Sequence, residues 1–112
     1  AAQRYPQHAV SAVASRITTA DHISILVHIE EPFRTRVRDE VLQFVLRGLT
    51  CNVAALDKTS MMLVCADMMV ALIRHELVLM RGAATTLETL LRDHSTRRAA
   101  MTVVGRLAEY YS

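Results

Sequence analysis

Residues 35–49 read TRVRDEVLQFVLRGL, and the apolar side chains in this stretch recur every three or four positions. That spacing places them on one face of an α-helix. The apolar positions are Val37, Val41, Leu42, Val45, Leu46 and Leu49. The polar positions between them include Arg36, Arg38, Asp39, Gln43 and Arg47. The stretch therefore predicts an amphipathic helix that buries one face.

Upstream of this helix, the sequence predicts two shorter ones. The N-terminal segment 1–19 contains an Ala- and Val-rich stretch, which favours one short helix over 7–16. A second helix is expected over 20–31 and should end at Pro32, because proline cannot continue a helix. Together with the amphipathic helix that follows, it forms a first helical pair, 20–49.

Downstream, we expect one long central helix over 57–81, ended by Gly82. Its apolar residues cover more than one stripe, so it should be enclosed on several sides. Four of these residues are methionines: Met61, Met62, Met68 and Met69. They fit two roles, because methionine fills irregular cores and also lines adaptable grooves for partner helices.

A second helical pair is expected over 84–112. Thr85 and Glu88 have the spacing of a capping box, which predicts a short helix over 86–93. A polar turn then leads to a last helix over 96–111. The residues expected on the inward side of that helix are Ala100, Val103, Val104, Leu107, Ala108 and Tyr111.

These elements predict a single all-α domain over 1–112. It should contain five to six helices, arranged as antiparallel pairs stacked into a short α-solenoid or bundle. The chain has 3 Gly and 2 Pro among 112 residues, too few turn residues for an all-β domain. Aromatic residues make up only 4% of the sequence, so the core must be mostly aliphatic.

The two predicted pairs also match each other in sequence. When one is shifted by 62 positions, Val37 falls on Ala99 and Val41 falls on Val103. Apolar positions coincide while most polar positions differ. Two repeated units under one packing constraint would produce this pattern, and so would two amphipathic helices in chance phase.

Residues 87–108 read LETLLRDHSTRRAAMTVVGRLA, a short Leu-rich helix, a polar turn and a longer helix. This stretch resembles armadillo and HEAT repeats, and residues 25–49 follow the pattern more loosely. The segment 57–81 departs from it because it is expected to form one long helix and not a pair. The resemblance implies stacked helical pairs that bind other macromolecules.

A narrower resemblance rests on DEVLQFVLRGL at 39–49, on Asp57 opening a long helix, and on LETLLR at 87–92. These stretches are similar to part of a middle domain of the initiation-factor-4G type, as in the scaffold subunit of the cytoplasmic deadenylase complex. The resemblance implies a HEAT-like fold that binds a nuclease and a helicase. The chain would be only part of such a domain, and its few aromatic residues depart from the pattern.

Residue patterns for catalysis or metal binding are absent from the sequence. His75 and Glu76 begin an HExxH motif, but Leu79 occupies the position of the second His. Cys51 and Cys65 have no CxxC or Cys/His ligand spacing. Gly-rich phosphate loops and nucleophile elbows are also missing. We therefore expect no enzyme activity, no cofactor and no metal, and a small-molecule substrate is not favoured.

The most suggestive polar residues are arginines. Three open the helix at 35–49, and three flank the equivalent turn of the second pair: Arg34, Arg36, Arg38, Arg92, Arg97 and Arg98. If the pairs stack, both sets should share one edge, which would suit phosphate or carboxylate binding. The net charge is only +2, and Asp39, Glu40 and Asp93 dilute the field, so a solvated mixed-charge edge explains the same residues.

Cysteines in apolar surroundings favour an intracellular, reducing compartment, and no stretch is long and apolar enough to span a membrane. No acidic residue precedes Asp21, as in a chain that follows an organelle import signal, so cytoplasm and mitochondrion both stay open. We predict a non-catalytic protein–protein interaction module, acting with other protein subunits as the scaffold or accessory subunit of a larger complex. The alternatives are an RNA- or phosphate-binding helical array that uses the Arg edge, which the few aromatics do not favour, and a structural subunit of a mitochondrial complex.

Overall fold

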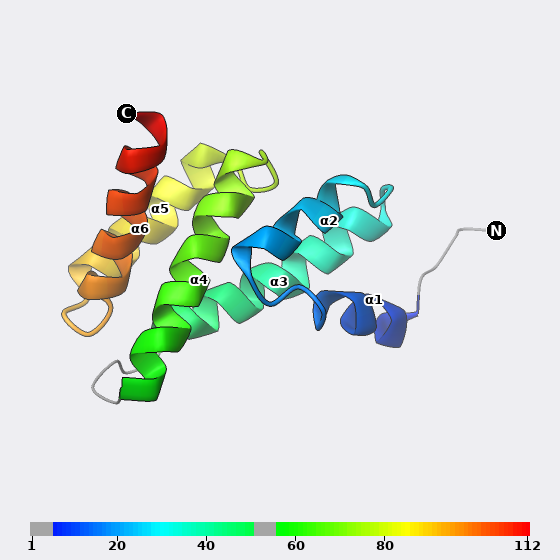
Figure 1. Ribbon diagram of the computed structural model, residues 1–112, viewed down its shortest axis with the longest axis horizontal. Helices are drawn as coiled ribbons and strands as arrows, with labels where there is room; N and C mark the ends of the chain where they lie inside the picture. The colour runs from blue at the N-terminus through cyan, green and yellow to red at the C-terminus, as the bar shows by residue number, and fades with distance from the viewer. Residues whose placement is uncertain (1–5, 51–55) are drawn as a thin grey trace.

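A computed structural model of the protein describes residues 6–50 and 56–112, and every regular element among them is a helix (Figure 1). In chain order the elements are α1 (Gln7–Ala14), the 3-10 helix η1 (Ala20–Ile23), α2 (Ser24–Val27), α3 (Phe33–Thr50), α4 (Leu56–Arg74), α5 (Met80–Arg92) and α6 (Arg97–Tyr111). The prediction of an all-α fold is confirmed.

Helix α4 lies at the centre of the molecule. It packs against α3, η1 and α6, while α1 packs on α3 and α5 packs on α6. Figure 1 shows α4 between α6 on one side and the α2 region on the other. In the same view α4 and α6 run in the same direction, and α5 returns the chain between them. The molecule is elongated, with extents of 48 × 31 × 23 Å.

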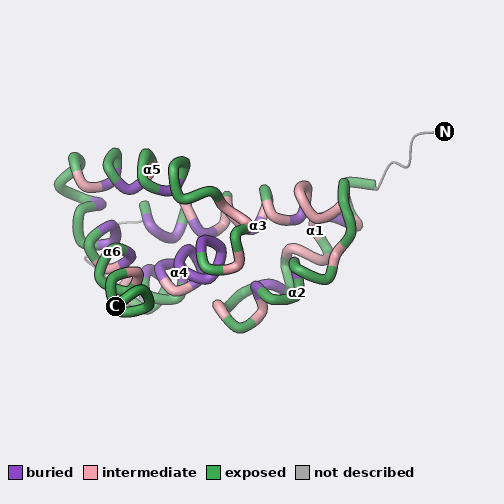
Figure 2. Tube along the Cα trace, turned by 90° about the horizontal axis from the view of Figure 1, so that it is seen from above, coloured by how far each residue is buried: buried purple, intermediate pink, exposed green. Residues whose placement is uncertain are grey.

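The core is aliphatic and centred on α4. From Cys65 to Ile73, every residue except Asp67 is buried (Figure 2). Such a helix touches neighbours on almost all sides, which explains why its apolar residues cover more than one stripe. The expectation that this segment is enclosed is therefore confirmed for the second half of α4.

Helix α3 agrees with the amphipathic pattern that predicted it. Val37, Val41, Val45 and Leu49 are buried, and they lie four residues apart on one face. On the same side, a Cβ built on Gly48 would come within 2.1 Å of the Cys65 sulfur in α4. A residue without a side chain is needed there, because α3 and α4 approach each other closely at that point.

The prediction of one long helix over 57–81 is wrong. Helix α4 ends at Arg74, and α5 begins at Met80 after a break. Glu76, inside this break, has a φ of 59°, in the left-handed region that side chains rarely adopt. The break lets the chain reverse direction, so that α5 can pack on α6.

Backbone hydrogen bonds define the end of α4. The N–H of Leu77 donates to the carbonyl of Leu72 (2.9 Å), and the N–H of Glu76 donates to that of Ile73 (3.0 Å). This is a Schellman motif, with Glu76 at the left-handed position that glycine usually takes. Gly82, which was expected to end the helix, instead lies in the first turn of α5.

The capping box predicted from Thr85 and Glu88 is also wrong, because α5 has already begun at Met80. The Thr85 hydroxyl donates to the carbonyl of Arg81 (3.2 Å), one turn earlier in the same helix. The short helix expected over 86–93 therefore becomes a 13-residue helix.

Near the N-terminus, the helix expected over 20–31 is much shorter. The chain forms η1 and then α2, which has 4 residues and stops at Val27. Two effects favour this early end. Glu30 and Glu31 would lie at a helix C-terminus, where the dipole disfavours carboxylates, and the residue before Pro32 avoids helical geometry. Helix α1 lies within the expected 7–16, and Cys51 lies outside the described residues.

The internal repeat stays a prediction. At the starts of the long helices the equivalent positions share burial, as Val41 and Val103 show. At their ends they differ, because Leu49 is buried and Tyr111 is 58% exposed. The short helices differ in length, with 4 residues in α2 and 13 in α5.

Candidate protein-binding surface

Three of the four methionines proposed for a groove are in the core. Met62, Met68 and Met69 are at most 1% exposed, while Met61 is 44% exposed. The groove interpretation is therefore wrong for the three buried residues, and the alternative of core filler is correct. Helix α4 has neighbours on nearly every side, so its thioethers fill space between helices.

The arginines at the start of α3 are used within the protein. Arg34 Nε donates to the carbonyl of Ile29 (2.7 Å), and Arg38 Nη1 donates to that of Leu77 (2.9 Å). Arg36 Nη2 donates to the Gln7 side chain (3.1 Å). These bonds tie α3 to the preceding loop, to the α4–α5 break and to α1.

Acidic groups balance the charge of the arginines at this end of α3. Arg38 forms an ion pair of 2.8 Å with Asp39, and a hollow of about 160 Å³ beside it is lined by both Glu31 and Glu76. The hydrogen bond from the Thr35 hydroxyl lowers the pKa of Glu31, and the nearby Arg34 and Arg38 add to this effect. The start of α3 is therefore a mixed-charge surface.

The second arginine set lies around the α5–α6 turn. Arg97 Nε donates to the carbonyl of Leu91 (3.1 Å), and Arg92 is exposed at the end of α5. In the turn, the backbone N–H of Ser95 lowers the pKa of Asp93. A shallow hollow of about 470 Å³ at the start of α6 is lined by His94, Arg97, Arg98, Met101 and Thr102.

The two arginine sets do not share one edge. Helix α3 begins beside α2 at one end of the long axis, while α6 begins at the other end (Figure 1). The interpretation of a single Arg edge assumed two stacked pairs in register. It is wrong because α4 lies between the pairs and α3 runs away from its own arginine-rich start toward α4.

Helix α6 carries an apolar surface that the other described residues leave open. Met101 is 61% exposed, Val104 44% and Tyr111 58%, and Ala108 between them is also exposed. Spacings of three, four and three residues put these four side chains on one face of the helix. We call Met101, Val104, Ala108 and Tyr111 the α6 stripe.

The core contact of α6 comes from other residues. Ala99, Ala100 and Val103 are buried against α4 and α5. The sequence placed Val104, Ala108 and Tyr111 on the inward side, and that assignment is wrong for all three. The sequence signal for this is the width of the apolar face of α6, because its apolar residues cover more of the helix surface than α4, α5 and the small contact with α3 bury.

The exposed apolar surface continues beyond the end of α6. Tyr111 lines a hollow of about 460 Å³ together with Ile73, Leu79 and Met80. Leu79 is 77% exposed, more than any other large apolar residue of the described chain. The α6 stripe therefore adjoins a second exposed apolar group at the α4–α5 break.

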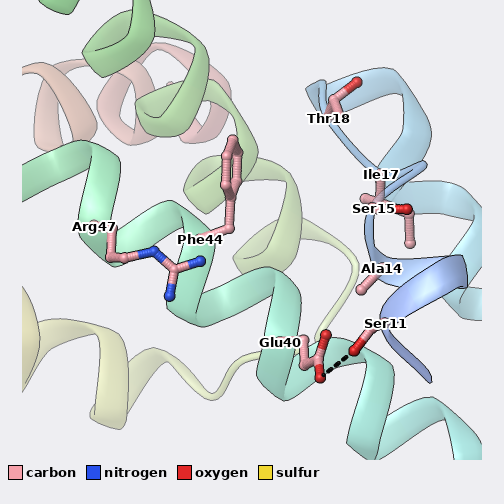
Figure 3. Close-up of a pocket in the computed structure, with 8 residues that line it drawn as sticks. All are labelled: Ser11, Ala14, Ser15, Ile17, Thr18, Glu40, Phe44 and Arg47. Atoms are coloured by element: carbon pink, nitrogen blue, oxygen red, sulfur yellow. Dashed lines mark hydrogen bonds between the residues drawn. The ribbon is translucent and has the colours of Figure 1, made fainter. Parts of the chain in front are cut away.

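A separate hollow of about 400 Å³ lies between the end of α1 and α3 (Figure 3). The Ser11 hydroxyl donates to Glu40 Oε1 (3.0 Å), and the Gln7 side chain donates to the same oxygen. Phe44 and Arg47 complete the α3 wall. The Glu40 carboxylate already accepts two hydrogen bonds from α1, so in this hollow it serves to fasten α1 to α3.

Within residues 6–50 and 56–112, no three His, Cys, Asp or Glu side chains come together as a metal site. Over the same residues, no helix has both the length and the apolar content needed to cross a bilayer. Cys65 is buried in the core.

No known protein family matches the chain, and no curated protein and no solved structure is significantly similar to it. The resemblances to armadillo or HEAT repeats and to the initiation-factor-4G-type middle domain therefore stay predictions.

Proposed function

We propose that this chain is a non-catalytic protein–protein interaction module that serves as the scaffold or accessory subunit of a larger complex. The supporting observation is the α6 stripe, an open row of apolar side chains on a well-packed helix. In this proposal the stripe binds another protein chain, and α4 with its neighbours provides the rigid support.

The stripe has no part in the core of the chain, because Ala99, Ala100 and Val103 already make that contact. Single exposed apolar residues are common, but a contiguous row with an adjoining apolar hollow is typical of binding surfaces. A helix face with anchors at three- and four-residue spacing is also a recurrent way to engage a groove or a second helix.

The alternative of an RNA- or phosphate-binding array has less support. It required the six arginines on one edge, and they lie at opposite ends of the molecule. Three of them donate to backbone carbonyls of the protein itself: Arg34, Arg38 and Arg97. A structural role in a mitochondrial complex would use the same α6 stripe, and cell fractionation separates that version from a cytoplasmic one.

The test is affinity purification from the source cells, comparing the wild-type chain with Val104→Asp. We expect a set of proteins that co-purifies with the wild type and is lost when a charge enters the stripe. Thr89→Asp is the matched control, because Thr89 is exposed on α5, outside the stripe. It should retain the same proteins.

Equal recovery of these proteins with wild type and Val104→Asp would remove the stripe as the binding surface. Loss of the proteins with both variants would show that any added charge disturbs the complex, and would equally contradict the proposal.

A further inference from the structure

We infer that the α6 stripe binds the α6 stripe of a second copy of this chain, in an antiparallel helix pair with a two-fold axis near Val104. This rests on the proposed function of the stripe and names its occupant. Three features of α6 support a second copy: an exposed tyrosine matched to a hollow, opposite charges on one flank, and a glycine at the centre.

The first feature relates the two ends of the stripe. In an antiparallel pair centred on Val104, the partner's Tyr111 lies opposite Arg97. The hollow of about 470 Å³ at that end is lined by Arg97, Arg98 and Met101 among others. An aromatic ring prefers contacts with a thioether and a guanidinium group. The exposed ring at one end of α6 therefore fits the hollow at the other end.

The second feature is charge. Arg98 and Glu109 are 11 residues apart, close to three full turns, so both lie on the same flank of the stripe. Antiparallel pairing brings Arg98 beside the partner's Glu109, and the two-fold axis repeats that contact. In a parallel two-fold pair, the flank that carries Arg98 and Glu109 would lie on opposite sides of the two helices, so Arg98 could not reach the partner's Glu109. The charge contact therefore requires the antiparallel arrangement.

The third feature is Gly105, exposed near the middle of α6. A Cβ built on it would meet no atom of the described residues within 4 Å, so packing inside the chain does not require glycine here. Glycine is among the least favourable residues in a helix interior. On the flank of the stripe, beside the small Ala108, it lets a second helix backbone approach closely.

The pair involves one 15-residue helix per chain, which gives an interface smaller than most stable dimers bury. A weak dimer follows, with dissociation in roughly the micromolar range or above. In an isologous interface of this kind every contact occurs twice, so one substitution changes two contacts.

The experiment is sedimentation velocity over a wide range of concentration, on the whole chain. Wild type should pass from monomer to dimer, and Met101→Asp should stay monomeric. Arg98→Glu and Glu109→Arg should each weaken the dimer about tenfold, because each creates two repulsive contacts. An equimolar mixture of these two variants should recover a dimer at least as tight as wild type, because every contact in the mixed pair is then between opposite charges.

Glu88→Arg on the exposed face of α5 makes the same change of charge outside the stripe and should leave the dimer unchanged. Circular dichroism confirms that each variant is folded. Recovery of the dimer in the mixture would not be expected if the stripe were an apolar surface that binds an unrelated protein.

A chain that stays monomeric at every concentration overturns the inference. So does weakening by both charge variants without recovery in their mixture. These outcomes are separate from the proposed function: if Val104→Asp still loses co-purified proteins while wild type is monomeric, the stripe binds a different protein. If the dimer forms and nothing else depends on the stripe, the scaffold role fails and the dimer stands.

Discussion

Helices α4 and α6 are neighbours that run side by side in the same direction, yet they use their apolar residues in opposite ways (Figure 1). Met68 in α4 is fully buried, whereas Met101 in α6 is 61% exposed. Two surface contacts link the helices. Asp67 lies 3.4 Å from Arg106 Nε, and the Arg74 guanidinium lies 5.3 Å from the centre of the Tyr110 ring.

The difference between the two helices comes from their neighbours. Helix α4 is covered by α3 and η1 on one side and by α6 on the other, while α6 packs mainly on α4 and α5 and has a small contact with α3 among the described residues. Apolar periodicity in the sequence indicates that one face of a helix is more stable when buried. It does not indicate whether the same chain or a partner buries that face. The uncovered face of α6 is therefore where a partner is expected.

The largest expected effect compares the two methionines directly. Met68→Ala should lower the free energy of unfolding by about 2–5 kcal/mol, because it leaves a cavity in a packed core. Met101→Ala should change it by less than about 0.5 kcal/mol, because the side chain is mostly in solvent. Urea unfolding followed by circular dichroism measures both. Similar losses for the two variants would contradict the contrast between α4 and α6.

Two glycines provide the next comparison. Gly48→Ala should destabilise the chain by about 1–3 kcal/mol, because the new methyl group collides with Cys65. Gly105→Ala should instead stabilise it by about 0.5–1 kcal/mol, through helix propensity in open space. The thermal unfolding midpoints of the two variants should move in opposite directions. Adding Cys65→Ala to Gly48→Ala should restore part of the loss, and no restoration would refute the collision.

The end of α4 allows a smaller test. Glu76→Gly should stabilise the chain by about 0.5–1 kcal/mol, since glycine adopts the left-handed conformation without a steric cost. Glu76→Gln is the control for the charge, because it keeps a side chain at the same position. Chemical denaturation of both variants separates the two effects. A gain for Gln equal to that for Gly would assign the effect to charge.

Loss of stability in acid should be traced to groups outside the α4 core and the α6 stripe. Among the residues whose burial the structure describes, the buried part of α4 and the α6 stripe contain no carboxyl group, whereas Glu31 accepts hydrogen bonds from the backbone and hydroxyl of Thr35. Its pKa is lowered on folding, so its contribution is present above the unfolded value of about 4.5 and is lost as pH falls. Glu31→Gln should flatten the decline in unfolding midpoint below this pH. An unchanged decline would exclude Glu31.

The sequence predicts those parts of the fold that depend on local pattern. The helix at 35–49 could be predicted because its apolar residues recur at helical spacing. The helices that pack on α3 then bury four of them: Val37, Val41, Val45 and Leu49. The break between α4 and α5 was missed because its signal is usually glycine, and Glu76 takes that position. The early end of α2 was missed because Pro32 alone was taken as the stop signal, whereas Glu30 and Glu31 already disfavour a helix C-terminus before it.

The candidate site was less predictable, because it depends on the relative placement of helices. The arginines were correctly read as mixed with acidic residues, but their distribution over two ends of the molecule follows from the position of α4. Three of the four residues of the α6 stripe were expected to face inward: Val104, Ala108 and Tyr111. Only the packing of α5 and α4 on α6 distinguishes Val103, which is buried, from Val104, which is open.

That adjacent pair gives the most direct test of the central claim, that the α6 stripe is a binding surface and not part of the core. The measurement is the urea-unfolding free energy of Val104→Asp next to that of Val103→Asp. We predict a loss of less than about 1 kcal/mol for Val104→Asp and of more than about 3 kcal/mol for Val103→Asp, because only the latter buries an unpaired carboxylate. Comparable losses for the two variants would place the stripe in the core and contradict the claim.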